Sequence, residues 1–161
     1  HEVRMCAVLL LVEKFKKQDE AVLKVYLRNT DRINNWDLVD LSAPQIVGGY
    51  LLNKGDRSLL YRLVKSESLW ERRIAIVSTL TFIRNGQFED TIAISEMLLG
   101  DSHDLIQKAT GWMLREMGKR DLSTLRAFLS KHSGKMSCTT LRYAIEKMGP
   151  EERKFWMNKR D

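Results

Sequence analysis

Apolar residues recur along the chain at three- and four-residue steps, which is the spacing of an amphipathic α-helix. In the first segment, residues 2–17, this stripe consists of Val3, Ala7, Leu10, Leu11 and Phe15. The same periodicity, bounded by residues that start and stop helices, extends over nine further segments: 21–27, 36–52, 57–64, 69–84, 88–99, 104–117, 123–129, 138–148 and 150–157. No segment is convincing as a strand. The pattern therefore predicts ten helices and an all-α fold.

Two residues are expected to interrupt or end these helices. Pro44 lies within 36–52, and because proline has no backbone N–H we expect a kink or a break near Ser42 and Ala43. Gly118 is expected to close the helix 104–117, since glycine is common just after helix C termini.

Several apolar side chains are expected to be buried. Trp70 and Trp156 should pack between repeats, and a free cysteine among apolar residues behaves as a small hydrophobe. The side chains expected inside are Cys6, Val22, Val25, Tyr26, Trp70, Cys138 and Trp156.

The first helices of successive pairs begin at nearly constant intervals, near residues 2, 36, 69, 103 and 136. The steps are 33 or 34 residues long, and a basic residue followed two places later by a small residue recurs at Arg4, Arg73 and Arg142. Self-similarity at this period is typical of stacked helix pairs. We therefore predict a helical-repeat solenoid of about five helix pairs, in which one helix of each pair lines a concave groove.

Length and composition are those of an ordinary globular protein. The 161 residues suit a single domain, 1–161, with 43% hydrophobic and 30% charged residues. The net charge of +6 permits a polyanionic partner without identifying one. The apolar run 5–12 is too short to cross a bilayer and no signal-peptide cleavage site follows it, so we expect a cytoplasmic protein without a membrane partner. Because the chain opens on His1 within a helical pattern, we expect a fragment.

No metal ion and no other cofactor is predicted. Neither Cys6 nor Cys138 belongs to a metal motif, and the histidines, His1, His103 and His132, show no ligand spacing. Residues 101–104 are more typical of a helix start than of a metal site.

Polar and aromatic residues on the first helix of each pair are candidates for the lining of the groove. Trp36 and Asp40 are four residues apart, as are Lys108 and Trp112, so each pair shares a helix face. An aromatic ring beside a carboxylate suits a cationic ligand. Cations spaced along a concave surface can follow a phosphate backbone, and the candidates for this role are Arg4, Arg73, Lys108, Arg115 and Arg142.

Each candidate also has a plainer structural explanation. The cations can be part of a solvated helix surface or of an intrahelical pair, such as Arg115 with Glu116. Asp37 and Asp40 lie in the first turns of a helix, where acidic residues are favoured by the helix dipole.

Three segments resemble the motifs of AlkD-type bacterial DNA alkylation repair enzymes: 35–40 (NWDLVD), 70–76 (WERRIAI) and 106–116 (IQKATGWMLRE). Segments 1–4 and 141–146 are similar to flanking parts of the same family, so the resemblance covers nearly the whole chain. It implies a DNA glycosylase of HEAT-like repeats, an alpha-alpha superhelix, that acts as a monomer and removes N3- and N7-alkylated purines from double-stranded DNA. It assigns catalysis to Asp40, contact with the lesion to Trp36 and Trp112, and the grip on the DNA backbone to Arg73.

Family domains extend some seventy residues upstream of the segment that resembles 1–4, so we expect this chain to be the C-terminal two thirds of the family domain. Without the upstream part, the apolar face of helix 2–17 should be exposed and the groove shortened. The competing hypothesis is a non-catalytic helical-repeat scaffold that binds DNA or protein through its concave face.

Overall fold

The structure is a computed structural model that describes residues 1–15 and 19–159. The α-helices are α1 (Glu2–Phe15), α2 (Glu20–Arg28), α3 (Trp36–Ala43), α4 (Gly49–Leu51), α5 (Ser58–Val64), α6 (Leu69–Arg84), α7 (Glu89–Leu98), α8 (Asp104–Arg120), α9 (Leu122–His132), α10 (Cys138–Ala144) and α11 (Pro150–Lys159). A π-helix, η1 (Pro44–Gly48), joins α3 to α4, and a 3-10 helix, η2 (Ser133–Lys135), follows α9. Across the described residues there is no strand.

The predicted all-α, helical-repeat fold is confirmed. When α3, η1 and α4 are counted as one continuous helix, the described residues form the ten helices expected. Residues 16 and 17, the predicted end of the first helix, lie outside the described residues.

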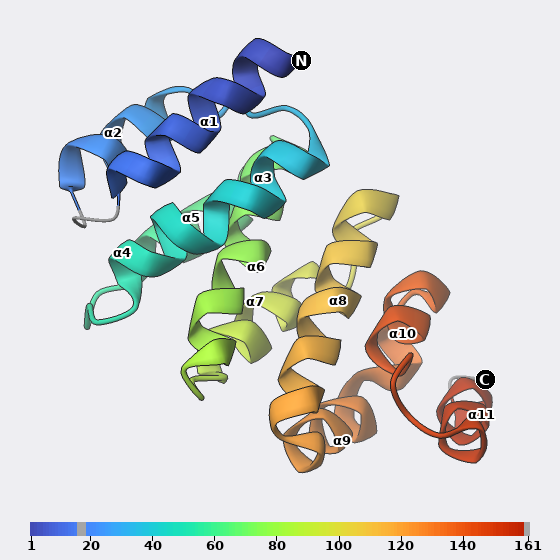
Figure 1. The fold of residues 1–161 in the computed structure, drawn as a ribbon. Helices are drawn as coiled ribbons and strands as arrows, with labels where there is room; N and C mark the ends of the chain where they lie inside the picture. The colour runs from blue at the N-terminus through green and yellow to red at the C-terminus, as the bar shows by residue number, and fades with distance from the viewer. Residues whose placement is uncertain (16–18, 160–161) are drawn as a thin grey trace. The chain divides into compact units, whose positions relative to one another are not determined.

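Contacts divide the chain into two compact units, His1–Phe82 and Ile83–Asp161, and α6 runs across the division. In the first unit, α1 packs against α2, α3 and η1 (Figure 1). In the second unit, α8 packs against α7, α9 and α10, and α11 packs against α10 and η2 (Figure 1). The assignment of 1–161 to a single domain stays a prediction.

The short helix α2 turns one face into the core of the first unit. Val22 and Tyr26 are buried as predicted, and the Tyr26 hydroxyl lies 2.8 Å from the Ser42 hydroxyl on α3. The prediction for Val25 is wrong, because its side chain is 45% exposed. The buried face of α2 is completed by Leu23 instead, on the other side of the helix from Val25.

One face of α1 is open to solvent. Val3 and Leu10 are exposed, and so is Cys6, whose predicted burial is wrong. The cysteine shares this outward face because the buried contacts of α1 are made on another side, by Val8 and Phe15.

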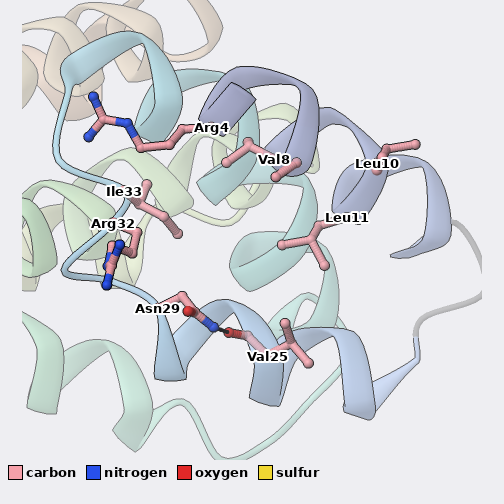
Figure 2. A pocket seen from close by; sticks show the side chains of 9 residues that line it. Arg4, Val8, Leu10, Leu11, Val25, Asn29, Arg32 and Ile33 are labelled. Atoms are coloured by element: carbon pink, nitrogen blue, oxygen red, sulfur yellow. Dashed lines mark hydrogen bonds between the residues drawn. The ribbon is translucent and has the colours of Figure 1, made fainter. Parts of the chain in front are cut away.

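A groove of about 430 Å³ lies between α1 and α2. Figure 2 shows Leu10, Leu11 and Val25 at one end of this groove and the side chains of Arg4 and Arg32 at the other. The lining is therefore apolar over most of its length and cationic at one end.

The kink or break predicted near Ser42 and Ala43 takes the form of a change in hydrogen bonding at Pro44, and the helix itself is not broken. Regular α-helical bonding ends at Ala43, and η1 carries the chain to Gly49, where the α-helix resumes. Backbone angles stay helical throughout, with φ −61° and ψ −42° at Pro44 and φ −61° and ψ −46° at Gly48. The proline thus changes the hydrogen-bond pattern of the helix without ending it.

The predicted helix end at Gly118 is wrong, because α8 continues to Arg120. A Cβ atom at Gly118 would lie 2.3 Å from Leu125 Cδ2 on α9. The glycine therefore allows α9 to approach α8 closely instead of terminating the helix. The helix predicted for 138–148 is shorter than expected, since α10 ends at Ala144.

Trp70 and Trp156 were both predicted to be buried between repeats, and the two predictions have different outcomes. Trp156 on α11 is buried, with 4% of its surface exposed, as expected. Trp70 at the start of α6 is only partly buried. Cys138 is also partly exposed, since it is the first residue of α10.

None of the helices in the described ranges is both long enough and apolar enough to span a membrane.

Gly111 marks a second close contact in the second unit, and its replacement by alanine should destabilise the protein. The added Cβ atom would lie 2.5 Å from the Thr140 carbonyl oxygen and 2.5 Å from Tyr143 Cβ, both on α10. Since backbone has to move to relieve this overlap, we expect Gly111→Ala to lower the free energy of unfolding by about 1–3 kcal/mol. Urea denaturation measures the loss.

Gly100→Ala is the matched control for this change. A Cβ atom at Gly100 meets no atom within 4 Å, so its effect should stay within about 0.5 kcal/mol. Equal stability of the two variants would contradict the tight α8–α10 contact.

Candidate functional site

The N terminus of α3 holds an aromatic side chain in solvent. Asn35 is the N-cap: its backbone is extended (φ −148°, ψ 150°), and its side-chain oxygen accepts a hydrogen bond of 2.8 Å from the Trp36 N–H. Trp36 is thereby fixed as the first residue of the helix, and 54% of its surface is exposed. A tryptophan this exposed is accessible to a ligand.

One turn further along α3, Asp40 is held by an arginine from the next repeat. Arg73 on α6 donates from Nε to Asp40 Oδ1 over 3.0 Å and from Nη2 to Oδ2 over 2.9 Å. Such a two-pronged arrangement fixes the plane of the carboxylate as well as its position. The side chain of Asp40 is 18% exposed and that of Arg73 is 6% exposed, so water reaches the acid more than the base.

The surroundings of Asp40 act on its charge in opposite directions. Burial raises the pKa of the Asp40 carboxyl, and the hydrogen bonds and positive charge of Arg73 oppose that rise. The negative charge of Asp37 adds to the rise. Arg73 therefore stabilises the ionised form of a carboxylate that burial disfavours.

Asp37 has a different environment from Asp40. It lies in the first turn of α3, where its Oδ1 accepts a hydrogen bond of 2.7 Å from the Leu38 N–H. Its Oδ2 lies 2.8 Å from His1 Nε2. These contacts fit the stabilisation of a helix start that the sequence indicated for Asp37.

The remaining candidate of the first unit, Arg4, borders the groove between α1 and α2. It donates a hydrogen bond to the side-chain oxygen of Asn34, the residue before the N-cap of α3. The predicted contact of Arg4 with a DNA backbone stays a prediction, and in this structure the residue links α1 to the segment that starts α3.

Four candidates lie in the second unit, on α8 and α10. Trp112 is partly buried, and Lys108 pairs with Asp104 over 2.7 Å on the same helix. Arg115 is bonded to Glu146, and its Nε lies 3.7 Å from Glu116 Oε1.

Arg142 differs from the other cations of the second unit. It is exposed on α10, and within the described residues it has no hydrogen bond or ion pair. Of the predicted cations in this unit, Arg142 is thus the one that presents its charge directly to solvent.

The structure brings Trp36, Asp40 and Arg73 together within the first compact unit. Trp112 belongs to the second unit, so its predicted place in the same site stays a prediction. Within residues 1–15 and 19–159, no group of three or more histidine, cysteine, aspartate or glutamate side chains is placed to hold a metal ion.

Sequence reasoning did not identify the pairing of Asp40 with Arg73. The sequence did contain an indication of this pairing. The two residues are 33 positions apart, which is the length of one repeat, so they occupy equivalent places on neighbouring helix pairs. Sequence reasoning also missed two hydroxyl residues of α6, Ser78 and Thr81, which bind backbone carbonyls at the junction of α3 and η1.

Comparison with known protein families gives one match. The family described as DNA alkylation repair enzyme matches residues 1–148. Comparison with curated proteins gives no match. Because the matched region covers most of the chain, including both compact units up to the loop before α11, the chain belongs to the DNA alkylation repair enzyme family.

Proposed function

We propose that this family member is a DNA glycosylase that excises positively charged N3- and N7-alkylated purines from duplex DNA, as a cytoplasmic monomer in base excision repair. One observation carries the proposal: an exposed indole, Trp36, lies one helical turn from a carboxylate, Asp40, that a buried guanidinium holds in place. A cationic ring is attracted to the face of an indole. A fixed carboxylate beside it is suited to a developing positive charge.

Cleavage of the bond between an alkylated purine and its sugar requires few catalytic groups beyond this tryptophan and carboxylate. An alkylated purine is already positively charged, so it leaves as a neutral base that keeps the electron pair of the broken C1′–N bond, without a strong general acid. The sugar is left with a developing positive charge. In the proposed mechanism Asp40 stabilises that charge, or orients the water whose oxygen bonds to C1′ while its proton is released to solvent.

The other candidates have supporting parts in this proposal. Arg73 keeps Asp40 ionised and oriented, and its guanidinium chemistry also suits the phosphate contact that the family resemblance implies. Trp112 is proposed as the second aromatic contact to the lesion. Arg142, together with Arg4, Lys108 and Arg115, is proposed to hold the DNA backbone.

Incubation with duplex DNA that contains 7-methylguanine tests the proposal, with the free base quantified over time. Release of the base supports a glycosylase. The competing function is a scaffold that binds DNA or protein without catalysis, which the engagement of Asp40 by Arg73 and of Arg115 by Glu146 favours. It predicts salt-dependent duplex binding and no base release at any protein concentration.

Replacement of Trp36 by alanine should weaken binding to the lesion. A cation–π contact is worth about 0.5–2 kcal/mol, so we expect Trp36→Ala to bind alkylated duplex about 2- to 30-fold less tightly. Binding to undamaged duplex should change little, because the backbone contacts remain. Titration of the two duplexes at one salt concentration measures the difference.

Phe155→Ala is the control for the loss of an exposed aromatic ring. Phe155 is 55% exposed and lies on α11, beyond the region that matches the family. We expect this variant to bind both duplexes as the unaltered chain does. An unchanged preference for alkylated DNA in Trp36→Ala would remove Trp36 from the lesion site.

A further inference from the structure

The interrupted helix α3–η1 is bonded to α6 at the point where its hydrogen-bond pattern changes. Pro44 has no N–H, so regular α-helical bonding cannot continue through it, and the backbone shifts to π-helical bonding. Two carbonyl groups at this junction accept hydrogen bonds from α6. Ser78 Oγ donates to the Ala43 carbonyl over 3.3 Å, and Thr81 Oγ1 donates to the Pro44 carbonyl.

The same region also brings the backbones of the two helices close together. A Cβ atom at Gly48, the last residue of η1, would lie 2.4 Å from the Ser78 carbonyl oxygen and 2.9 Å from Thr81 Oγ1. Gly48 is buried, and Thr81 is partly buried. Only a glycine leaves room for the backbone of η1 to rest against α6 in this way.

The contacts between the two helices follow one another in the same direction along both of them. Asp40 meets Arg73 first, the Ala43 carbonyl then meets Ser78, and the Pro44 carbonyl meets Thr81. A slip of either helix would disturb all three contacts together, because packed helices move as rigid elements.

We propose that Thr81 and Ser78, with Gly48 as their contact surface, are positioning residues that set the register of α3 against α6 and so hold the Asp40 carboxylate against the Arg73 guanidinium. The effect on catalysis rests on the proposed function, whereas the effect on the Asp40–Arg73 pair does not. Neither hydroxyl is proposed to touch the reacting atoms. The two residues affect catalysis only because they fix the position of α3, which carries Asp40.

Of the two hydroxyls, that of Thr81 makes the shorter bond to the α3–η1 segment. The single hydroxyl proton of Ser78 is shared between the Ile74 carbonyl of its own helix, at 2.6 Å, and the Ala43 carbonyl, at 3.3 Å, so the bond to Ala43 is the weaker of the two. Thr81 bonds across the interface to the carbonyl of Pro44, the first residue of η1. Its replacement by valine removes this bond and keeps the shape of the side chain.

Thr79 provides a matched control on the same helix. It is fully buried, and its hydroxyl donates to the Ile76 carbonyl over 2.7 Å, within α6. Thr79→Val therefore removes a buried threonine hydroxyl without touching the contact with η1.

The experiment compares Thr81→Val, Thr81→Ser and Thr79→Val by two measurements. The first is solvent exchange of the Arg73 Nε–H proton by NMR, with its resonance assigned by its loss in Arg73→Lys. The second is kcat and KM for base release from alkylated duplex. For Thr81→Val we expect about tenfold faster exchange and about tenfold lower kcat, the effect of one lost hydrogen bond, with KM unchanged. Thr81→Ser should restore both values, and Thr79→Val should leave both unchanged.

Several results would overturn the inference. Unchanged Nε–H exchange in Thr81→Val would show that the hydroxyl does not hold the pair, and an equal loss in Thr79→Val would reveal a general loosening of α6. If Thr81→Val does not fold, Ser78→Ala is measured in its place. Because the bond of Ser78 to Ala43 is longer, we expect about a threefold change in Nε–H exchange and in kcat. An unchanged exchange rate in Ser78→Ala would then contradict the inference. If the unaltered chain releases no base, the proposed glycosylase function fails, while the exchange measurement still decides the positioning role.

Discussion

The Asp40→Asn variant is expected to release alkylated purine about 100- to 1000-fold more slowly than the unaltered chain, the usual loss when one preorganised stabilising group is removed. The amide keeps the size of the carboxylate and can still accept a hydrogen bond from Arg73. It lacks the negative charge that would stabilise the sugar cation. Release of 7-methylguanine from duplex DNA, followed in single-turnover conditions, measures the chemical step apart from product release.

Asp37→Asn is the control, because Asp37 shares the first turns of α3 but contacts His1 and its own helix instead of Arg73. We expect it to keep the rate of the unaltered chain. The pH profile gives a second check: protonation of Asp40 removes its charge, so the rate should fall as the pH falls. Because burial raises the pKa of Asp40, this fall should begin at a higher pH than for an exposed aspartate. Equal rates for Asp40→Asn and the unaltered chain would exclude Asp40 from the mechanism.

Arg73→Met is expected to cause the largest loss of stability, about 3 kcal/mol at neutral pH. The methionine fills much of the volume of the arginine but leaves the Asp40 carboxylate, which is only 18% exposed, without its guanidinium partner. The loss should shrink as the pH is lowered. Without Arg73 the folded-state pKa of Asp40 rises further above its unfolded value, so ionisation of Asp40 destabilises the folded state and protonation at low pH relieves it. Urea denaturation at neutral and acidic pH measures both effects.

A double variant shows how much of the stability loss in Arg73→Met comes from the broken ion pair and how much from altered packing. Arg73→Met combined with Asp40→Leu should recover most of the stability, because a buried ion pair can often be replaced by apolar side chains without loss. Arg84→Met, at the exposed end of α6, should leave the free energy of unfolding nearly unchanged. A deficit in Arg73→Met that is the same at every pH would contradict the role of the Asp40 charge.

The helices could be predicted because their signals are local. Apolar periodicity and caps identify segments such as α3, whose N-cap Asn35 and change of hydrogen bonding at Pro44 both follow from residue types in sequence. Gly118 could not be interpreted in the same way. A glycine can end a helix or allow a close contact, and the choice was decided by Leu125 on another helix. The outward position of Cys6 likewise depends on which side of α1 meets its neighbours.

The candidate site was predictable to the extent that it lies on one helix. The four-residue spacing of Trp36 and Asp40 places them on one face of α3 whatever the packing is. The burial of Arg73 and its bond to Asp40 depend on how α3 and α6 meet, and periodicity within one helix contains no such information. The recurrence of cationic residues on the first helix of each pair indicated a row of positive charges. It could not show that Arg115 is bonded to Glu146 while Arg142 is exposed.

The π-helix η1 also makes the length of this segment critical. A π-helical turn holds about one residue more than an α-helical turn, so η1 is equivalent to a one-residue insertion in an otherwise regular helix. Loss of Pro44 would remove the extra residue together with the missing N–H, allow α-helical bonding to continue, and rotate the preceding part of the helix by about 100° relative to the rest. With Ile46 and Val47 still in the core, Asp40 would turn away from Arg73 on α6. A deletion of the Pro44 codon would therefore remove the Asp40–Arg73 pair without altering either residue.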